Sequence, residues 1–548
     1  AGASSPTMSR HSMPLVERRT FSFLRLLLLG LFLAQEGVAI LVDRVTVADR
    51  VKEQALFQWI EEHGGKVSGL KIQTPSDGGP RGVFTTVKVP NNTLVFYIPH
   101  TVVIHKGMIL NEALNPDFNR FFNPLKDSFR GDDCVLMGLY IMFERFYNPQ
   151  VSFIKPYLDL LPQDVGAYSF LPKFWDNDLR ELFRTLPSGF RVYFLKQQAF
   201  EQIPEFLRND ILTPLQRYVA TYHQRNILAE ELMGRFAWAS AAVQTRAWHG
   251  LSRKYFVGDT TNIPSGNCTM VPLADMLNHR SNAGALVAVT KVFEDGSKRT
   301  FAHGIQNILG DIPAGGEIYD SYAGDDKELC NIDHLLVFGF VDPHPMVDCF
   351  KFSVTIDFGT GSNFPEEKKK LLESLGLLLP DSKEIWFVLR GSTAEVSRVN
   401  TRLLLFMRIW SISTTFELDL AKEIIEKFTR EELDYAVWSL NHERKSIQKL
   451  RENLAVLKSS AFQSSIEDDL RVEREIDEAL DTNAADTDHE YLHRKKMILE
   501  IGRREKMVLE VYWETLNKHW LGLLEENASR PRANDIAFEC VAGQECLV

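Results

Sequence analysis

The chain has 548 residues, which is too long for one ordinary hydrophobic core, so two or three domains are expected. Hydrophobic residues make up 45% of it and charged residues 25%, the usual range of soluble globular proteins. The formal net charge of -11 argues against binding nucleic acid through phosphate contacts.

The N-terminal residues 1–45 are typical of a targeting segment. Arg18 and Arg19 precede an apolar run over residues 26–34, and small residues follow it, which is the order found in a signal peptide. The run is short for a membrane span, and Arg25 directly before it keeps a signal anchor open. The segment therefore predicts a secretory route, a signal anchor or plastid import, with membrane contact only through these residues if they are not cleaved.

The next part of the chain changes from strands to helices and back. Helical spacing of apolar residues predicts a helix over residues 51–63, and β-branched runs predict strands over 83–89 and 94–99. Strand patterns return over residues 269–318. Helices are predicted between these strands, over 134–146, 209–224 and 229–246. This order indicates a helical insert, at about residues 105–250, within a β-rich domain.

Residues 348–525 are predicted to be helical, because Leu, Glu, Lys and Arg recur there at helical spacing. Long helices are expected over 430–457 and 491–520. The polar, acidic stretch between them, 464–489, is expected to contain a loop. Residues 526–548 are expected to form a flexible tail.

The six cysteines indicate neither a zinc module nor a disulfide framework. No two of them have the spacing of a zinc knuckle, and none clusters with histidine in the sequence. They are sparse for a disulfide scaffold, although a Cys540–Cys546 link in the tail stays open. No metal is expected.

Four short patches point to chemistry. Gly79–Phe84 offers a glycine just before a strand, where backbone can approach a ligand closely. Thr245-Arg246 ends the helix predicted over 229–246, and an arginine can pair with a carboxylate through two hydrogen bonds. The other two patches are Asp275–His279 and the stretch from Tyr322 to Phe340. Each patch alone is weak evidence, but their order and spacing are specific.

Together these patches resemble the RuBisCO large-subunit lysine methyltransferase-like family of SET-domain proteins, from about Val51 to Leu524. The resemblance implies an α+β fold, with a β-rich, pseudoknotted SET domain over residues 46–347 that is interrupted by the helical insert. An all-α substrate-binding domain over 348–525 follows. The family lacks zinc-binding cysteine modules, in agreement with the cysteines here.

The resemblance also implies roles for particular residues. Tyr322 aligns with the catalytic tyrosine of the family. The expected ligands of the cofactor, S-adenosyl-L-methionine, are Arg81, Gly82, Val83, Phe84, Arg246, Asn278, His279 and Phe338. The expected substrate channel contains Trp248, Ala274, Asp275 and Asn331.

The implied activity is SN2 transfer of a methyl group to a lysine of a non-histone protein, which would dock on the C-terminal helical domain. No nucleic-acid partner is implied. A histidine methyltransferase is an alternative, but Trp248 and Ala274 stand where the histidine-modifying branch has other residues, which favours lysine. A third possibility is a SET-like binding module without turnover.

The chain departs from the family pattern beside the predicted catalytic residue. Residues 325–330 lengthen the link after Tyr322. Phe338 and Asp333 replace the usual Tyr and Glu. Because Phe338 lacks the hydroxyl that would hold an amine or a water, it is expected to favour di- or trimethylation.

Overall fold

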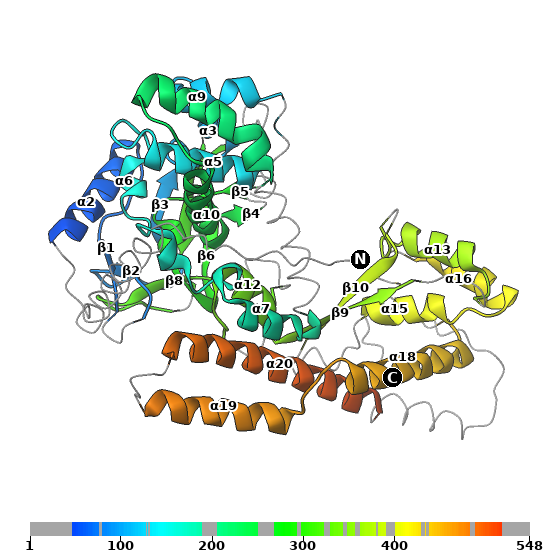
Figure 1. Cartoon of the computed structure of the whole chain (residues 1–548). Coiled ribbons are helices and arrows are strands. Elements are labelled where there is room, and N and C mark those ends of the chain that lie inside the picture. Colours follow the sequence, from blue (N-terminus) through cyan, green and yellow to red (C-terminus); the bar gives the residue numbers. More distant parts are fainter. Residues whose placement is uncertain are drawn as a thin grey trace, which may run out of the picture.

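A computed structural model describes most of the chain between residues 47 and 517. The described residues are 47–75, 79–127, 129, 132–188, 205–249, 268–292, 298–308, 310–322, 329–343, 348–356, 362–379, 382–390, 401–428, 433, 438–482 and 488–517. The targeting segment, residues 325–328 of the lengthened link after Tyr322, and the tail lie outside them. Figure 1 shows a larger lobe built around a sheet, a smaller lobe beside it, and long C-terminal helices that run beneath both.

A six-stranded sheet forms the centre of the larger lobe, with the strand order β1-β2-β8-β6-β7-β3. Its strands are β1 (Leu70–Gln73), β2 (Gly82–Thr85), β3 (Leu94–Pro99), β6 (Asn278–Val292), β7 (Lys298–Gln306) and β8 (Glu317–Asp320). Strand β8 lies between two strands that are distant in the sequence, antiparallel to β2 and parallel to β6. A separate pair, β4 (Trp248–His249) and β5 (Cys268–Thr269), is antiparallel.

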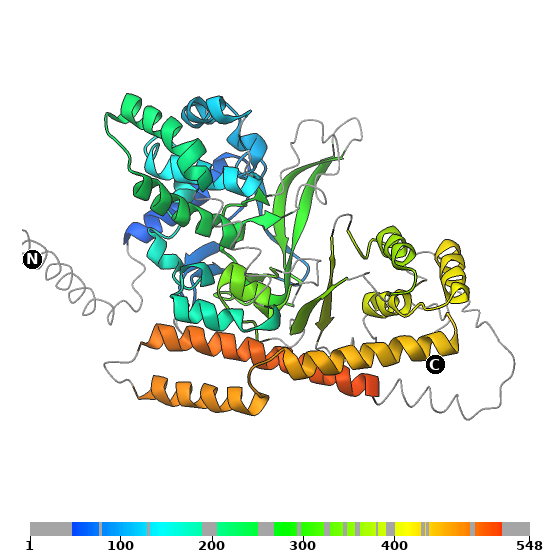
Figure 2. The ribbon, with the colours of Figure 1, turned by 45° about the vertical axis from the view of Figure 1, so that its right-hand side comes forward.

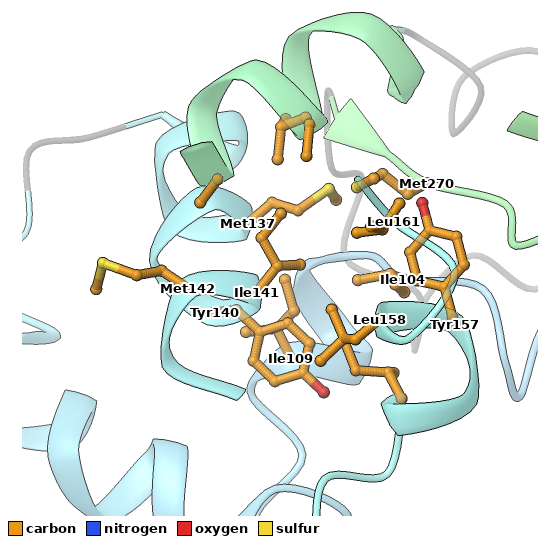
Figure 3. Close-up of a cluster of buried hydrophobic side chains, with 14 of the residues drawn as sticks. Ile104, Ile109, Met137, Tyr140, Ile141, Met142, Tyr157, Leu158, Leu161 and Met270 are labelled. Atoms are coloured by element: carbon orange, nitrogen blue, oxygen red, sulfur yellow. The ribbon is translucent and has the colours of Figure 1, made fainter. Parts of the chain in front are cut away.

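The helices of this lobe bury a large apolar core. They are α2 (Val47–Glu62), α3 (Lys106–Ile109), α4 (Pro116–Phe122), α5 (Asp133–Phe146), α6 (Lys155–Leu158), α7 (Asn177–Arg184), α9 (Leu212–His223), α10 (Ala229–Arg246) and α12 (Asn331–Phe338). Helix α5 is apolar on nearly all sides, as expected for a helix at the centre of a core. Figure 3 shows Met137 and Ile141 of α5 lying with Leu158 of α6 and Met270.

The C-terminal part is mainly helical, as predicted, but it also contains two strands. Its elements are β9 (Cys349–Thr355), α13 (Pro365–Ser374), β10 (Glu384–Arg390), α15 (Thr401–Trp410), α16 (Thr415–Lys427), α18 (Leu440–Ser460), α19 (Ile466–Asp481) and α20 (His489–Thr515). The all-α expectation is wrong, because β9 and β10 form an antiparallel pair whose apolar side chains enter the helical core. The acidic stretch is mostly helix α19, which begins with a capping box formed by Ser465 and Asp468.

Helix α20 joins the C-terminal helices to the larger lobe. Its Ile498 and Ile501 share one buried cluster with Leu335 of α12 and Phe183 of α7. Figures 1 and 2 both show α20 running beneath α7, with α19 alongside it on the other side. Arg504 of α20 adds an ion pair to Asp348, with 2.9 Å between Nη1 and Oδ1. The helical part therefore supports the segment that carries α12.

Two cysteine pairs that the sequence did not reveal lie together. Cys134 is bonded to Cys268, with 5.3 Å between their Cα atoms, and Cys330 to Cys349, with 5.6 Å. Both separations are in the range of disulfides. Within the described ranges, no helix has both the length and the apolar character needed to cross a membrane.

Replacing Gly339 by alanine is expected to lower the stability of the larger lobe. Gly339 ends α12 with φ +77°, and an added Cβ would lie 2.3 Å from the ring of Phe170. The left-handed conformation alone costs a residue with a side chain about 1–2 kcal/mol. Thermal unfolding followed by circular dichroism measures the loss.

Gly234→Ala is the matched control. Gly234 lies exposed within α10, and an added Cβ there meets nothing within 4 Å. Alanine should stabilise that helix by roughly 0.5–1 kcal/mol. The interpretation fails if both variants melt at the same temperature.

Candidate functional site

The parallel pairing of β6 and β8 brings the last two motif patches together. Asn278 pairs with Tyr319, and His279 with Asp320. Tyr322 follows β8 by two residues, so it lies beside His279. Its backbone N–H donates to His279 Nδ1 at 3.1 Å, and its hydroxyl donates to the carbonyl of Leu277 at 2.8 Å. Tyr322 is therefore fixed at both its backbone and its side chain.

A cavity of about 780 Å³ opens beside Tyr322. Seven of the predicted site residues line it: Arg81, Arg246, Asp275, Asn278, His279, Tyr322 and Phe338. The other lining residues are Pro80, Pro162, Tyr168, Phe170, Thr245, Met276, Leu277, Gly339 and Phe340. All four sequence patches thus contribute to one cavity, which is large enough for a small-molecule cofactor.

Helix α10 and helix α12 meet at this cavity through one side chain. Gln244 Nε2 donates to the carbonyls of Leu336 and Val337, at 2.9 and 3.2 Å, near the end of α12. This contact brings Arg246, two residues after Gln244, and Phe338, one residue after Val337, to the same wall. On another side, Arg81 reaches the cavity while its Nη2 donates to the carbonyl of Leu160 at 2.5 Å.

Gly82 acts on the cavity indirectly. An added Cβ would lie 2.3 Å from Glu317 Oε1 and 2.7 Å from Asn278 Nδ2, so only glycine leaves room for these two side chains. Asn278 Nδ2 donates to Glu317 Oε1 at 2.7 Å and to the carbonyl of Pro80 at 3.2 Å. The next two predicted residues, Val83 and Phe84, are buried within β2.

Three predicted channel residues lie away from the lining that the described residues form. Trp248 pairs with Thr269 in the small β4–β5 sheet. Ala274 is buried next to Asp275, a residue that does line the cavity. Asn331 is buried at the start of α12, where it bonds to Asp342. The fourth, Asp275, is the channel residue that the structure brings to the cavity.

A buried carboxyl, that of Asp275, lies among the residues that line the cavity. The Tyr157 hydroxyl donates to Asp275 Oδ2, and Arg246 Nη1 donates to the backbone carbonyl of Asp275 at 2.9 Å. Arg246 Nη1 also lies 4.0 Å from Asp275 Oδ1. Burial raises the pKa of the Asp275 carboxyl to about 7, although the charge of Arg246 and the hydrogen bond from Tyr157 oppose it.

Sequence reasoning missed several residues of the site. Tyr157 lies on a four-residue helix with no motif, and Asp342 and His334 reach His279 only through the fold. Phe340 lay inside a recognised motif without an assigned role, and it lines the cavity with Phe338. Phe340 and His334 lie inside a recognised sequence patch, whereas Tyr157 and Asp342 lie outside all four patches.

Comparison with solved structures identifies the class of fold. The chain matches the crystal structure of the SET domain of LSMT bound to lysine and AdoHcy with a TM-score of 0.59 and 17% identity, covering 87% of this chain and 93% of that chain. With the same coverage, it matches that domain bound to MeLysine and AdoHcy at a TM-score of 0.58 and 16% identity. Rubisco LSMT bound to AdoMet matches at 0.56 and 16% identity, again over 87% and 93%. No family model and no curated protein sequence matches the chain.

The protein therefore has the fold of a SET domain. More particularly, it has the mixed α+β arrangement of Rubisco LSMT, with small sheets followed by a C-terminal helical region. The predicted fold class is confirmed, apart from the β9–β10 pair. At 16–17% sequence identity, the likeness to these solved structures establishes the fold alone.

The raised pKa of Asp275 predicts that the contribution of this carboxyl to the stability of the folded protein falls as the pH rises from about 4 toward 7. The folded state holds the Asp275 proton more tightly than the unfolded state, whose pKa is near the ordinary 3.8, so deprotonation in this window favours unfolding. Each unit of pKa difference corresponds to about 1.4 kcal/mol. Asp320, also buried with its pKa raised to about 7, contributes in the same direction.

Urea unfolding at several pH values between about 4 and 7 measures this dependence. Because the other titrating groups are unchanged, Asp275→Asn should make the change of stability with pH more positive than it is in the wild type. Asp311→Asn is the control, because Asp311 is exposed and its pKa is lowered by Lys88, so it does not titrate in this window. An unchanged slope in Asp275→Asn would overturn the assignment.

Proposed function

We propose that the protein is an S-adenosylmethionine-dependent protein-lysine N-methyltransferase. The proposal is supported by the fold, because the solved structures that share it are described as bound to lysine or MeLysine and to AdoHcy or AdoMet. The observation that carries it is the position of Tyr322, which is fixed beside His279 on the wall of a cavity that all four sequence patches line.

The cavity suits the proposed cofactor. Arg246 Nε is buried and has no hydrogen-bond partner in the described part of the protein, and Arg81 lines the same cavity. Two guanidinium groups at one cavity favour an anionic group such as the carboxylate of S-adenosylmethionine. Asn278, His279 and Phe338 would hold the remainder, with Gly82 leaving room for Asn278. When bound, the cofactor supplies a methyl group on a positively charged sulfur.

Tyr322 would orient the reacting amine rather than remove its proton. Burial raises the pKa of the Tyr322 phenol above its usual range, so the hydroxyl stays protonated at neutral pH. That proton is donated to Leu277, which leaves the oxygen lone pairs for an amine N–H. The protein thereby aligns the nucleophile.

The preference for lysine over histidine rests on the fold comparison. Trp248 and Ala274, which favoured lysine in the sequence, lie outside the described cavity lining, so they give the preference no structural support. Free lysine and MeLysine are the ligands named for the solved structures. We further propose that the protein substrate is not a histone and docks on the helical residues 348–525. The two alternatives are a histidine methyltransferase and a SET-like binding module without turnover. The test below distinguishes both from a lysine methyltransferase.

The test is transfer of labelled methyl from S-adenosylmethionine into proteins of a cell extract, followed by mass spectrometry of the labelled residue. Tyr322→Phe should reduce kcat by roughly 100-fold, because a misplaced amine loses in-line alignment. Tyr319→Phe is the matched control, since its hydroxyl bonds to Glu317 Oε2 at 2.8 Å and Tyr319 does not line the cavity. Label on histidine, or cofactor binding without transfer, would favour the respective alternative.

Phe338→Tyr is expected to shift the product toward monomethyllysine. The Phe338 ring lies 4.6 Å from the Tyr322 ring, centroid to centroid, so an added hydroxyl would reach the space where the amine turns between rounds. It would hold the amine or a water there. Mass spectrometry of the product measures the ratio, and a wild-type enzyme that makes only monomethyl product contradicts the role given to Phe338.

A further inference from the structure

A cluster of three polar side chains lies beside Tyr322, and the proposed chemistry gives a role to only one of them, His279. His279, His334 and Asp342 place their ring nitrogens and carboxylate within 4.8 Å of one another. His334 and Asp342 are buried, and His279 is nearly so. Two histidines and an aspartate are residue types that often bind a metal ion. The hydrogen bonds of the cluster indicate whether it binds a metal or has another role.

The backbone of Tyr322 fixes the tautomer of His279. A backbone N–H can only donate, so His279 Nδ1, 3.1 Å from the nitrogen of Tyr322, must offer its lone pair. The ring proton of neutral His279 is therefore on Nε2, which donates to Asp342 Oδ2 at 2.8 Å. A metal on Nε2 would move the proton to Nδ1, where it would face the N–H of Tyr322. The observed geometry favours a hydrogen-bond relay over metal binding.

Asp342 is itself held firmly. Ser281 Oγ donates to the same carboxylate oxygen at 2.5 Å. The side chain of Asn331 bonds to the backbone of Asp342 on both sides, accepting from its N–H at 2.7 Å and donating to its carbonyl at 3.0 Å. Arg504 of α20 also donates to that carbonyl, at 3.4 Å. The carboxylate is thus a fixed acceptor for His279.

We propose that Asp342 is a positioning residue for Tyr322. By accepting from His279 Nε2, it keeps Nδ1 free to accept from the backbone of Tyr322, and so holds the Tyr322 hydroxyl at the Leu277 carbonyl. The rings of His279 and Tyr322 lie 5.1 Å apart, so a change in the imidazole orientation moves the phenol. The effect of Asp342 on catalysis rests on the proposed function. Its effects on the His279 tautomer and on the position of Tyr322 do not depend on that function.

The test is ¹⁵N NMR of the deuterated full-length chain, labelled at histidine ring nitrogens and tyrosine amides. His279→Gln identifies the His279 signals among the 14 histidines. In the wild type, Nδ1 should show the shift of an unprotonated nitrogen and Nε2 that of a protonated one. In Asp342→Ala, the two tautomers of His279 should interconvert, so the ¹⁵N shifts of Nδ1 and Nε2 should move toward each other. The amide signal of Tyr322 should also shift.

Activity measurements separate positioning from folding. Asp342→Ala should lower kcat by up to roughly 100-fold, with little change in the dissociation constant of S-adenosylmethionine. Asp342→Asn keeps an acceptor oxygen and should restore most of the rate and the wild-type tautomer. Asp348→Ala is the matched control, because Asp348 also bonds to Asn331 and Arg504 but not to His279, so it should alter stability without altering the tautomer.

Two results would overturn the proposal: a proton on Nδ1 in the wild type, or an Asp342→Ala variant that keeps both the tautomer and the Tyr322 amide signal. Asp342→Ala with unchanged kcat in an active enzyme overturns it as well, while leaving the proposed function intact. If the wild type transfers no methyl group, the proposed function fails, and the NMR shifts alone decide the positioning role.

Discussion

The register between β6 and β8 is the constraint on which the site depends. This pairing sets Asn278 and His279 beside the end of β8, and so joins Tyr322 to a histidine 43 residues earlier in the chain. A slip of one residue would turn each side chain to the opposite face of the sheet. Individual backbone hydrogen bonds contribute only about 1 kcal/mol each, so the register matters here for geometry more than for stability. Strand β2, on the other side of β8, sets Gly82 where Asn278 needs room.

Much of the site follows from local sequence signals. The helix predicted over 229–246 is α10, because its apolar residues keep a helical period, and it delivers Arg246 to the cavity. The strand predicted over 94–99 is β3. Gly82, Asn278, His279 and Tyr322 stood out because their residue types suit ligand approach and their order resembled a known family. Such short-range patterns can be recognised in the sequence alone, because each depends on a few neighbouring residues.

The rest depends on contacts that no local pattern encodes. Tyr157 and Asp342 meet Asp275 and His279 only after distant segments pack together. Trp248 and Ala274 had the right sequence positions, but strand pairing and burial direct them away from the cavity lining. The acidic stretch 464–489 is mostly helix α19, which ends at Asp481, where the predicted loop over 481–486 begins, and residues 483–486 lie outside the described residues.

The position of helix α20 late in the sequence affects when the site gains its full support during synthesis of the chain. A ribosome-bound chain that has emerged as far as β10 already contains every predicted site residue. It still lacks Ile498 and Ile501, which pack against α12, and Arg504, which binds Asp342 and Asp348. The support of Tyr322 is therefore completed only after helix α20 has been synthesised. A nascent chain that ends at β10 would carry all the motifs without the contacts that α20 supplies.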